Sequence, residues 1–256
     1  SNCSGVPVNP RPADVINLSL GGTDRSLLEE SLITELLEAG AIVVASAGNS
    51  ASTTPIYPAA YPGVIGVSAV TLNQTLAPYS SFGSFVDVAA PGGDTSQNID
   101  GDPYVDGVVS TGGNDAQGPV EYNYPFFQGT SMAAPHVAGV FALMRSVNAS
   151  LTPALVSAML EAGDLTIPLG GQADGRNDNF GYGLIDAQKA VAAALASDGN
   201  PPPPQPWLGV VPGALNYGAT LESLVITVRN NSGGDLNILS IESSEPWLTI
   251  PPLNGL

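Results

Sequence analysis

The sequence predicts an α/β fold: a mostly parallel β-sheet with helices on both faces. Two observations carry this prediction. First, Asp14–Leu20, Ala41–Ala47 and Val64–Val70 are short, nearly continuous apolar runs, which is typical of parallel strands buried on both faces. Second, a helical pattern of apolar residues lies between the first two runs. Strand, helix and strand in this order form a right-handed crossover unit.

The first helix is expected between Asp24 and Gly40. Asp24 is a candidate N-cap, and Gly40 stands where helices often end in a left-handed residue. Apolar residues recur at the spacing of one helix face: Leu28, Leu32, Leu36 and Ala39. This spacing is that of a core-facing stripe.

The later segments continue the alternation of strands and helices. Val86–Gly93 and Gly107–Gly113 read as short strands that run into glycine turns. A helix is expected from about Met132 to Val147. Thr152 and Pro153 fit the N-cap and first position of another helix, which Gly163 ends, and an alanine-rich helix should cover about Asp186 to Ala196.

The chain changes character after residue 197. Residues 198–206 form a proline-rich linker, which we expect to be extended and semi-rigid. Residues 207–256 alternate apolar runs with turns rich in Asn and Gly, the pattern of β-strands. This length is roughly half of what a two-sheet sandwich needs. We therefore expect the start of a small β-sandwich module, left incomplete, and both ends of the sequence read as cut ends.

The composition excludes several partners. With 23 acidic and 6 basic residues the formal net charge is −17, so nucleic acid and anionic membrane surfaces would be repelled. No apolar run approaches the roughly 18 to 20 residues of a membrane helix, and no signal peptide opens the sequence. The single cysteine, Cys3, is either a lone thiol or half of a disulfide whose partner lies elsewhere.

Ser131 is the candidate nucleophile. It stands where a helix begins, and unpaired N–H groups at a helix N-terminus can stabilise an anion that develops beside it. Its neighbours in Gly129–Gly139 (GTSMAAPHVAG) are mostly small, which lets the helix sit deep in a core. By itself, a serine in this position is more often an ordinary N-cap.

Five motifs, in order, overcome that ordinary interpretation: VINLSLGG, VVASAGN, YPAAYPGVIGVSAV, GTSMAAPHVAG and FGYGLIDA. Each resembles a segment of the subtilisin-like serine proteases (subtilases), and together they span about Asp14 to Ala196. The resemblance implies a serine endopeptidase that hydrolyses peptide bonds by acyl transfer. Residues 1–197 would then be the C-terminal part of its catalytic domain.

The resemblance assigns roles to individual residues. Ser131 matches the nucleophile, and Asn49 matches the side-chain amide that stabilises the tetrahedral oxyanion. Independently, Asn49 follows a buried strand and a glycine, so its amide would project from the carboxyl end of the sheet, where sites of α/β proteins lie. Without the resemblance, an Asn after Gly more often only shapes a turn.

The substrate-binding residues also follow from the resemblance. A substrate peptide would add as an extra strand beside Ser19, Leu20 and Gly21. The opposite wall of the primary pocket and its floor would come from Ser46, Ala47, Gly48 and Ala59. None of these residues is charged, so a neutral, mainly apolar substrate side chain is expected there.

The sequence lacks a general base for Ser131, although serine needs one to become a good nucleophile. The only histidine, His136, lies five residues along the same helix, which turns it by about 140° and moves it about 7.5 Å along the axis. We expect it to be a buried structural histidine. Lys189 belongs to a surface helix, and a glutamate-based arrangement would require an acidic residue in place of Asn49.

Three explanations are therefore expected. The chain is a fragment of a longer protease whose N-terminal part supplies the missing aspartate and histidine, or a companion chain supplies them. Alternatively, the chain is a pseudoprotease. In the last case the chain is a non-catalytic peptide- or matrix-binding protein. Expected partners are a protein or peptide substrate and the N-terminal part of the same protease.

No cofactor is required for acyl transfer, but structural calcium is possible. The loops Asn98–Gly107 and Ala173–Asn179 are rich in oxygen ligands, and Asp100 and Asp102 stand at the alternate spacing that suits calcium. The alternative is a solvated acidic loop.

The tail from Trp207 loosely resembles sandwich modules of secreted bacterial hydrolases, which favours an extracellular location. Trp207 and Trp247 are either core residues or a stacking surface.

Overall fold

The computed structural model describes residues 12–114, 121–170, 175–197, 208–211 and 227–230. The chain divides into two compact units, Ser1–Pro201 and Pro202–Leu256. In the second unit the described residues form one antiparallel pair, β11 (Leu208–Val211) and β12 (Thr227–Asn230). The predicted linker, Cys3, Trp207, Trp247 and the rest of the predicted sandwich lie outside the described residues.

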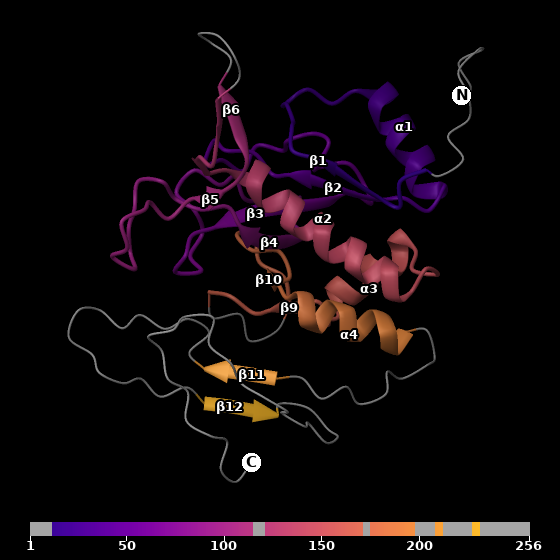
Figure 1. Ribbon diagram of the computed structural model, residues 1–256. Helices are drawn as coiled ribbons and strands as arrows, with labels where there is room; N and C mark the ends of the chain where they lie inside the picture. Colours follow the sequence, from indigo (N-terminus) through magenta and orange to yellow (C-terminus); the bar gives the residue numbers. More distant parts are fainter. Residues whose placement is uncertain (1–11, 115–120, 171–174, 198–207, 212–226, 231–256) are drawn as a thin grey trace, which may run out of the picture. The chain divides into compact units, whose positions relative to one another are not determined.

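The first unit is built on a six-stranded sheet (Figure 1). In spatial order its strands are β1 (Val15–Leu18), β2 (Ile42–Ser46), β3 (Ile65–Val70), β4 (Val88–Pro91), β10 (Leu184–Ile185) and β9 (Thr166–Ile167). All neighbours run parallel except β10 and β9, which are antiparallel. The predicted α/β fold with a mostly parallel sheet is confirmed.

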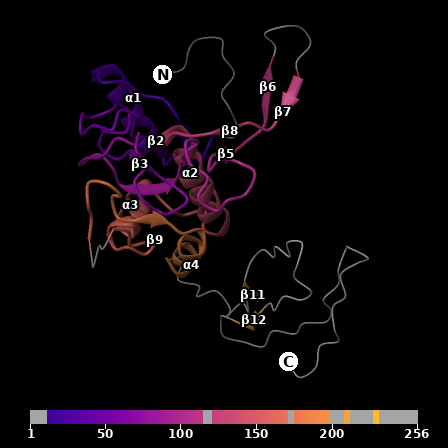
Figure 2. The same ribbon diagram turned by 90° about the vertical axis from the view of Figure 1, so that its left-hand side faces the viewer.

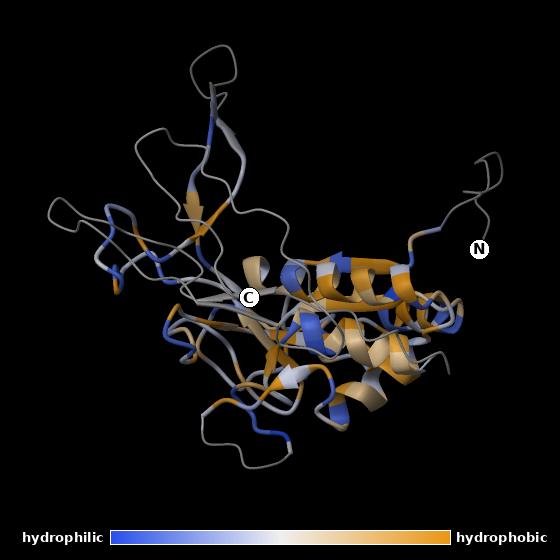
Figure 3. Cartoon of the chain, turned by 60° about the horizontal axis from the view of Figure 1, so that its bottom comes forward, coloured by the Kyte–Doolittle hydropathy of each residue, from blue (hydrophilic) through white to orange (hydrophobic). Residues whose placement is uncertain are grey.

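Helices cover both faces of the sheet: α1 (Leu27–Glu38), α2 (Thr130–Val147), α3 (Pro153–Glu161) and α4 (Ala187–Ser197). Because successive strand residues point to opposite faces, β2 divides its side chains between two cores. Val43 and Ala45 pack with Ile33 of α1, whereas Ile42 and Val44 pack on the face covered by α2, α3 and α4. Hydrophobic segments concentrate in these layered elements (Figure 3).

The central strands are as buried as the sequence predicts, but the first is not. Every residue of β2 and β3 is buried. By contrast β1, which lies at the edge of the sheet, is mostly half-buried. The sequence pattern marks β1 as apolar but does not show that one of its edges is uncovered.

The first helix differs from its prediction at two points. Its N-cap is Ser26, whose hydroxyl accepts the Glu29 N–H, and not Asp24. The predicted stripe is solvent-exposed: Leu28, Leu32 and Leu36 are 73%, 46% and 39% exposed. Ile33 is instead the buried residue of this helix. Only the end of the helix agrees, since Gly40 has φ +90°.

The other helices begin and end close to their predicted limits. Thr152 caps α3 by accepting the Leu155 N–H, Pro153 occupies its first turn, and Gly163 follows its end with φ +75°. The nucleophile helix α2 begins at Thr130, and α4 runs from Ala187 to Ser197.

Two short antiparallel ribbons precede α2: β5 (Val108–Val109) with β8 (Phe126–Phe127), and β6 (Gly112–Asn114) with β7 (Glu121–Asn123). The second ribbon projects away from the body of the first unit (Figures 1 and 2). Among the described residues, no helix has the length and apolar character needed to cross a membrane.

Candidate active site

Ser131 occupies the second position of α2, next to the end of the sheet. The N-cap Gly129 has φ 145° and, as a glycine, offers no side-chain cap, and the Thr130 N–H is bonded to Asn49 Oδ1. Within the described part of the chain, no acceptor is bonded to the Ser131 N–H. The N-terminus of α2 therefore offers a backbone donor and a partial positive charge beside the Ser131 hydroxyl.

The predicted substrate strand lies directly against this serine. Ser19 Oγ donates to the Ser131 carbonyl at 2.8 Å, and Ser131 Oγ donates to the Ser19 carbonyl at 3.4 Å. The long second bond leaves the Ser131 hydroxyl only weakly held. The structure thus brings together two residues that are 112 positions apart in the sequence.

Asn49 is held beside Ser131 with a defined orientation. Its Oδ1 accepts both the Thr130 N–H and the Thr130 hydroxyl, each at 2.9 Å. Because both donors bind the oxygen, the amide group must present Nδ2 on its other side. Asn49 is solvent-exposed, so that Nδ2 is free to donate to an oxygen that develops a negative charge next to Ser131.

A tyrosine supports the loop that carries the nucleophile. Tyr79 Oη lies 2.8 Å from the Gly92 carbonyl, 2.7 Å from the Gly93 carbonyl and 2.9 Å from the Gly129 nitrogen, which donates to it. Burial raises the pKa of Tyr79 to about 12. The hydroxyl therefore stays protonated at all ordinary pH values and ties the N-cap of α2 to the end of β4.

The two predicted walls of the primary pocket face each other. Ser46 and Ala47 are buried, and the Ser46 hydroxyl lies 3.5 Å from the Leu20 carbonyl on the opposite segment. Gly48 has φ +100° and its N–H donates to Thr130 Oγ1 at 3.2 Å, which joins this wall to the nucleophile helix.

The predicted floor residue, Ala59, is buried. Ala59 is only 2% exposed and belongs to the core on the α1 face of the sheet. The side chain that lies against the glycines of both walls is that of Ile56.

His136 is placed away from the Ser131 hydroxyl, as its sequence position predicts, but it is exposed rather than buried. Its Nδ1 lies 2.7 Å from the Met132 carbonyl. The prediction of a buried histidine is wrong because this side of α2, including Pro135 and Gly139, is open to solvent.

Among the described residues, no histidine, lysine or carboxylate is hydrogen-bonded to Ser131 Oγ. Lys189 is committed elsewhere, because its Nζ donates to the Gly163 and Thr166 carbonyls at 3.0 and 2.5 Å. The described residues thus contain a candidate nucleophile and candidate oxyanion donors, and no candidate general base is bonded to the Ser131 hydroxyl.

The carboxylates of the acidic loop bond to the backbone of the same loop. Asp100 Oδ1 accepts the Asp102 N–H at 3.2 Å, and Asp102 Oδ1 accepts the Tyr104 N–H at 2.8 Å. These carboxylates shape turns of their own loop. In the described part of the chain, no three residues among His, Cys, Asp and Glu converge in a way that could hold a metal ion.

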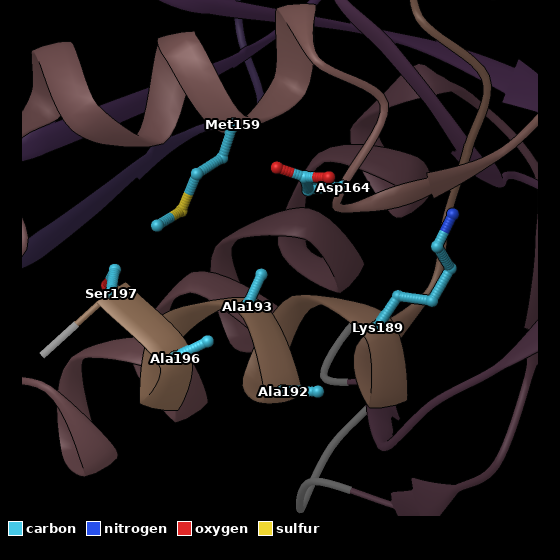
Figure 4. A pocket seen from close by; sticks show the side chains of 7 residues that line it. All are labelled: Met159, Asp164, Lys189, Ala192, Ala193, Ala196 and Ser197. Carbon is cyan, nitrogen blue, oxygen red and sulfur yellow. The ribbon is translucent and has the colours of Figure 1, made fainter. Parts of the chain in front are cut away.

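A separate hollow of about 580 Å³ lies between α3 and α4 (Figure 4). Met159 and Asp164 face α4 across it, and Ser197 closes one end. Ser197 Oγ is bonded to Asn148, which follows the C-terminus of α2. Because α2 is about 25 Å long, this hollow is remote from Ser131 and is not part of the candidate active site.

Three residues of the site were missed from the sequence: Thr130, Tyr79 and Ile56. Thr130 directly precedes Ser131, and that position was a usable signal. Tyr79 and Ile56 reach the site only through the fold, since no local pattern connects them with Ser131.

Comparisons with known proteins identify the family of this chain. The sequence profile of the subtilase family matches residues 4–183. A protein of Xanthomonas campestris pv. campestris called "Extracellular protease" is 38% identical over 195 residues, which cover 75% of this chain and 30% of the relative. An "Extracellular basic protease" of Dichelobacter nodosus is 35% identical over 79% of this chain and 31% of its own length. The chain thus spans less than a third of these two relatives.

A solved structure is also similar. A protease of Pseudoalteromonas arctica matches with a TM-score of 0.64 and 38% identity, over 75% of this chain and 55% of that chain. Subtilisin E of Bacillus subtilis is 35% identical over 182 residues, or 70% of this chain and 41% of the relative. The family profile covers more than half of the sequence, and the chain belongs to the subtilase family of serine proteases.

Proposed function

We propose that this chain carries the nucleophile, the oxyanion donors and the substrate strand of a serine endopeptidase. The observation that carries the proposal is the arrangement at the start of α2. Asn49 is fixed through its oxygen by Thr130, directly before Ser131. Such an arrangement aims one side-chain donor and one backbone donor at the same point in space, as an oxyanion hole requires.

In the proposed mechanism, a substrate peptide pairs with Ser19–Gly21, which places its carbonyl carbon near Ser131 Oγ. Oγ attacks that carbon while a base takes the hydroxyl proton. Asn49 Nδ2 and the Ser131 N–H stabilise the oxyanion of the tetrahedral intermediate. The intermediate collapses as the amine leaves with a proton, and water then hydrolyses the acyl-enzyme.

We further propose that the base and its orienting acid come from a polypeptide segment outside these 256 residues. Two features support this. The edge strand β1 is only half-buried, and unpaired strand edges are normally covered or blunted in stable proteins. Beside it, one side of α2 exposes Pro135, His136 and Leu143, the last of which is 52% exposed. A covering layer would protect both surfaces.

The full enzyme is proposed to act on protein or peptide substrates outside the cell. Two relatives are named as extracellular proteases, and the net charge of −17 suits a highly soluble secreted protein. Structural calcium and a role of residues 207–256 in holding the enzyme near its substrate stay proposals.

The second candidate is a pseudoprotease that only binds peptides or a matrix. The single observation that favours it is that no general base lies at Ser131 among the described residues. This candidate keeps the groove beside Ser19–Gly21 but predicts no acyl-enzyme.

A fluorophosphonate probe separates the two candidates. The test protein is the intact protease that contains this chain together with its N-terminal part, and it is compared with Ser131→Ala and with Ser146→Ala. Ser146 is a matched control, because it is an exposed serine on the same helix. We expect labelling of the intact protease and of Ser146→Ala, and none of Ser131→Ala. A folded intact protease that is not labelled would establish the binding protein instead.

A further inference from the structure

Ile56 occupies the space between the two walls of the primary pocket. A Cβ placed on Gly21 would lie 2.5 Å from Ile56 Cγ2, and one placed on Gly48 would lie 2.9 Å from Ile56 Cγ1. A single side chain therefore lies in van der Waals contact with the backbone of both walls. Only glycine tolerates so close an approach at the two wall positions.

The backbone of Ile56 is held in this place by its neighbours. Tyr57 and Gly22 exchange two hydrogen bonds of 2.8 and 2.9 Å, and the Ile56 carbonyl accepts the Ala60 N–H at 2.8 Å. Because the β-branched side chain of isoleucine is also stiff at χ1, Ile56 has little freedom to move away from the two walls. Ile56 is half-buried, so part of its surface is accessible.

The residues on either side of Ile56 are uncharged: Leu20 and Gly21 belong to one predicted wall and Gly48 to the other. The Ser46 hydroxyl lies 3.5 Å from the Leu20 carbonyl, so the two walls come close to each other at that point. A long or aromatic substrate side chain would overlap with Ile56, whereas a methyl or hydroxymethyl group would rest on it.

We propose that Ile56 sets the depth of the primary pocket and restricts the residue before the scissile bond to glycine, alanine or serine. This inference rests on the proposed function, because it assumes that a peptide pairs with Ser19–Gly21. In this proposal Ile56 takes the place of the expected floor residue, Ala59, whose side chain is buried in the core on the α1 face.

The first test is a specificity profile of the intact protease, measured with peptides that differ only in the residue before the scissile bond. For the natural enzyme we expect kcat/KM for alanine to exceed that for phenylalanine by at least about 100-fold, since a steric block excludes a whole ring. Ile56→Ala should raise kcat/KM for leucine and phenylalanine by about tenfold or more, and Ile56→Val should fall between. Ile99→Ala is the matched control in an exposed loop.

The second test does not depend on catalysis. In the Ser131→Ala protease, calorimetry compares product peptides that end in alanine or in phenylalanine, with and without Ile56→Ala. Preferred binding of the alanine peptide, lost in Ile56→Ala, supports the inference even if no variant hydrolyses peptides, a result that would contradict only the proposed function. Equal affinities, no measurable affinity for either peptide, or a preference unchanged by Ile56→Ala would overturn it.

Discussion

Thr130 holds the side-chain oxygen of Asn49 with two hydrogen bonds of 2.9 Å, one from its backbone N–H and one from its hydroxyl. Thr130 is fully buried, and its hydroxyl oxygen also accepts the Gly48 N–H. One side chain thus links the nucleophile helix, the proposed oxyanion donor and a wall of the primary pocket. The orientation of Asn49 is therefore built into the fold before any substrate binds.

Thr130→Val tests this link, because valine has nearly the same shape but no hydroxyl. Asn49 keeps one of its two hydrogen bonds and should lose part of its fixed orientation, which costs about 1–2 kcal/mol in the transition state. We expect kcat/KM of the intact protease to fall about tenfold. Thr130→Ser retains the hydroxyl and should stay within about threefold of the natural enzyme. Equal rates for both variants would contradict the proposed link.

Asn49→Ala removes the proposed side-chain donor itself. Removal of such a donor lowers kcat by about 10²- to 10³-fold in subtilisin, a member of the same family, and we expect a loss of that order here. KM should change little, because the interaction forms mainly in the transition state. A change in KM with an unaltered kcat would show that Asn49 binds the ground state instead.

Tyr79→Phe removes the hydroxyl that joins Gly129 to the carbonyls of Gly92 and Gly93. The Gly129 N–H still donates to the Gly92 carbonyl at 3.0 Å, but the Gly93 carbonyl loses the Tyr79 donor. This loss should lower the free energy of unfolding by about 1–3 kcal/mol, as measured by chemical denaturation. The matched control is Tyr122→Phe, since Tyr122 is 87% exposed. Equal stabilities of the two variants would mean that water or another group replaces the Tyr79 hydroxyl.

We expect the buried carboxyl group of Asp87 to make the stability of the fold depend on pH. Burial raises its pKa from 3.8 to about 6, opposed by the hydrogen bond from the Gly66 N–H and by Arg176. The folded state therefore binds this proton more tightly than the unfolded state. Its contribution to stability is complete below about pH 4 and is lost as the pH rises through 6.

Asp87→Asn keeps an acceptor for the Gly66 N–H and removes the titration. When the pH is raised from 4 to 8, the unfolding free energy of the variant should increase by about 1–3 kcal/mol relative to that of the natural protein. Denaturation curves at several pH values provide the measurement. A variant whose pH profile matches that of the natural protein would place the titration on another group.

Gly66 and Gly139 form a matched pair for testing the core. A Cβ on Gly66 would lie 2.0 Å from the Phe85 carbonyl oxygen, whereas one on Gly139 meets nothing within 4 Å. Gly66→Ala should destabilise the fold by about 3 kcal/mol or more. Gly139→Ala should stabilise it by up to about 1 kcal/mol, because alanine is the better helix former. Similar effects at both positions would contradict the packing of β3.

Much of the fold could be predicted from sequence because its signals are local. Thr152, Pro153 and Gly163 mark the ends of α3 through their own backbone preferences. The stripe of α1 was misassigned because helical spacing identifies an apolar side but not the neighbour that covers it. Leu28 and Ile33 lie on different sides of the helix, and the sheet beneath α1 covers Ile33.

The candidate site shows the same difference between features that local sequence predicts and features that depend on the fold. The neighbourhood of Ser131, Asn49 and Ser19 followed from motifs that a family resemblance can align. The hydrogen bonds from Thr130 to Asn49 and the contact of Ile56 with both predicted pocket walls depend on side-chain positions, which no motif encodes. The exposure of His136 was also missed, because the spacing along α2 says where it points but not what lies there.

We propose that this chain contributes the nucleophile and the oxyanion donors, while the proton acceptor comes from elsewhere. The most direct measurement is the rate of fluorophosphonate labelling of Ser131 in the 256-residue chain alone and after assembly with the N-terminal part of the protease. We expect little or no labelling of the chain alone and rapid labelling of the assembled protein. Rapid labelling of the chain alone would contradict it, because a base would then have to lie within these residues.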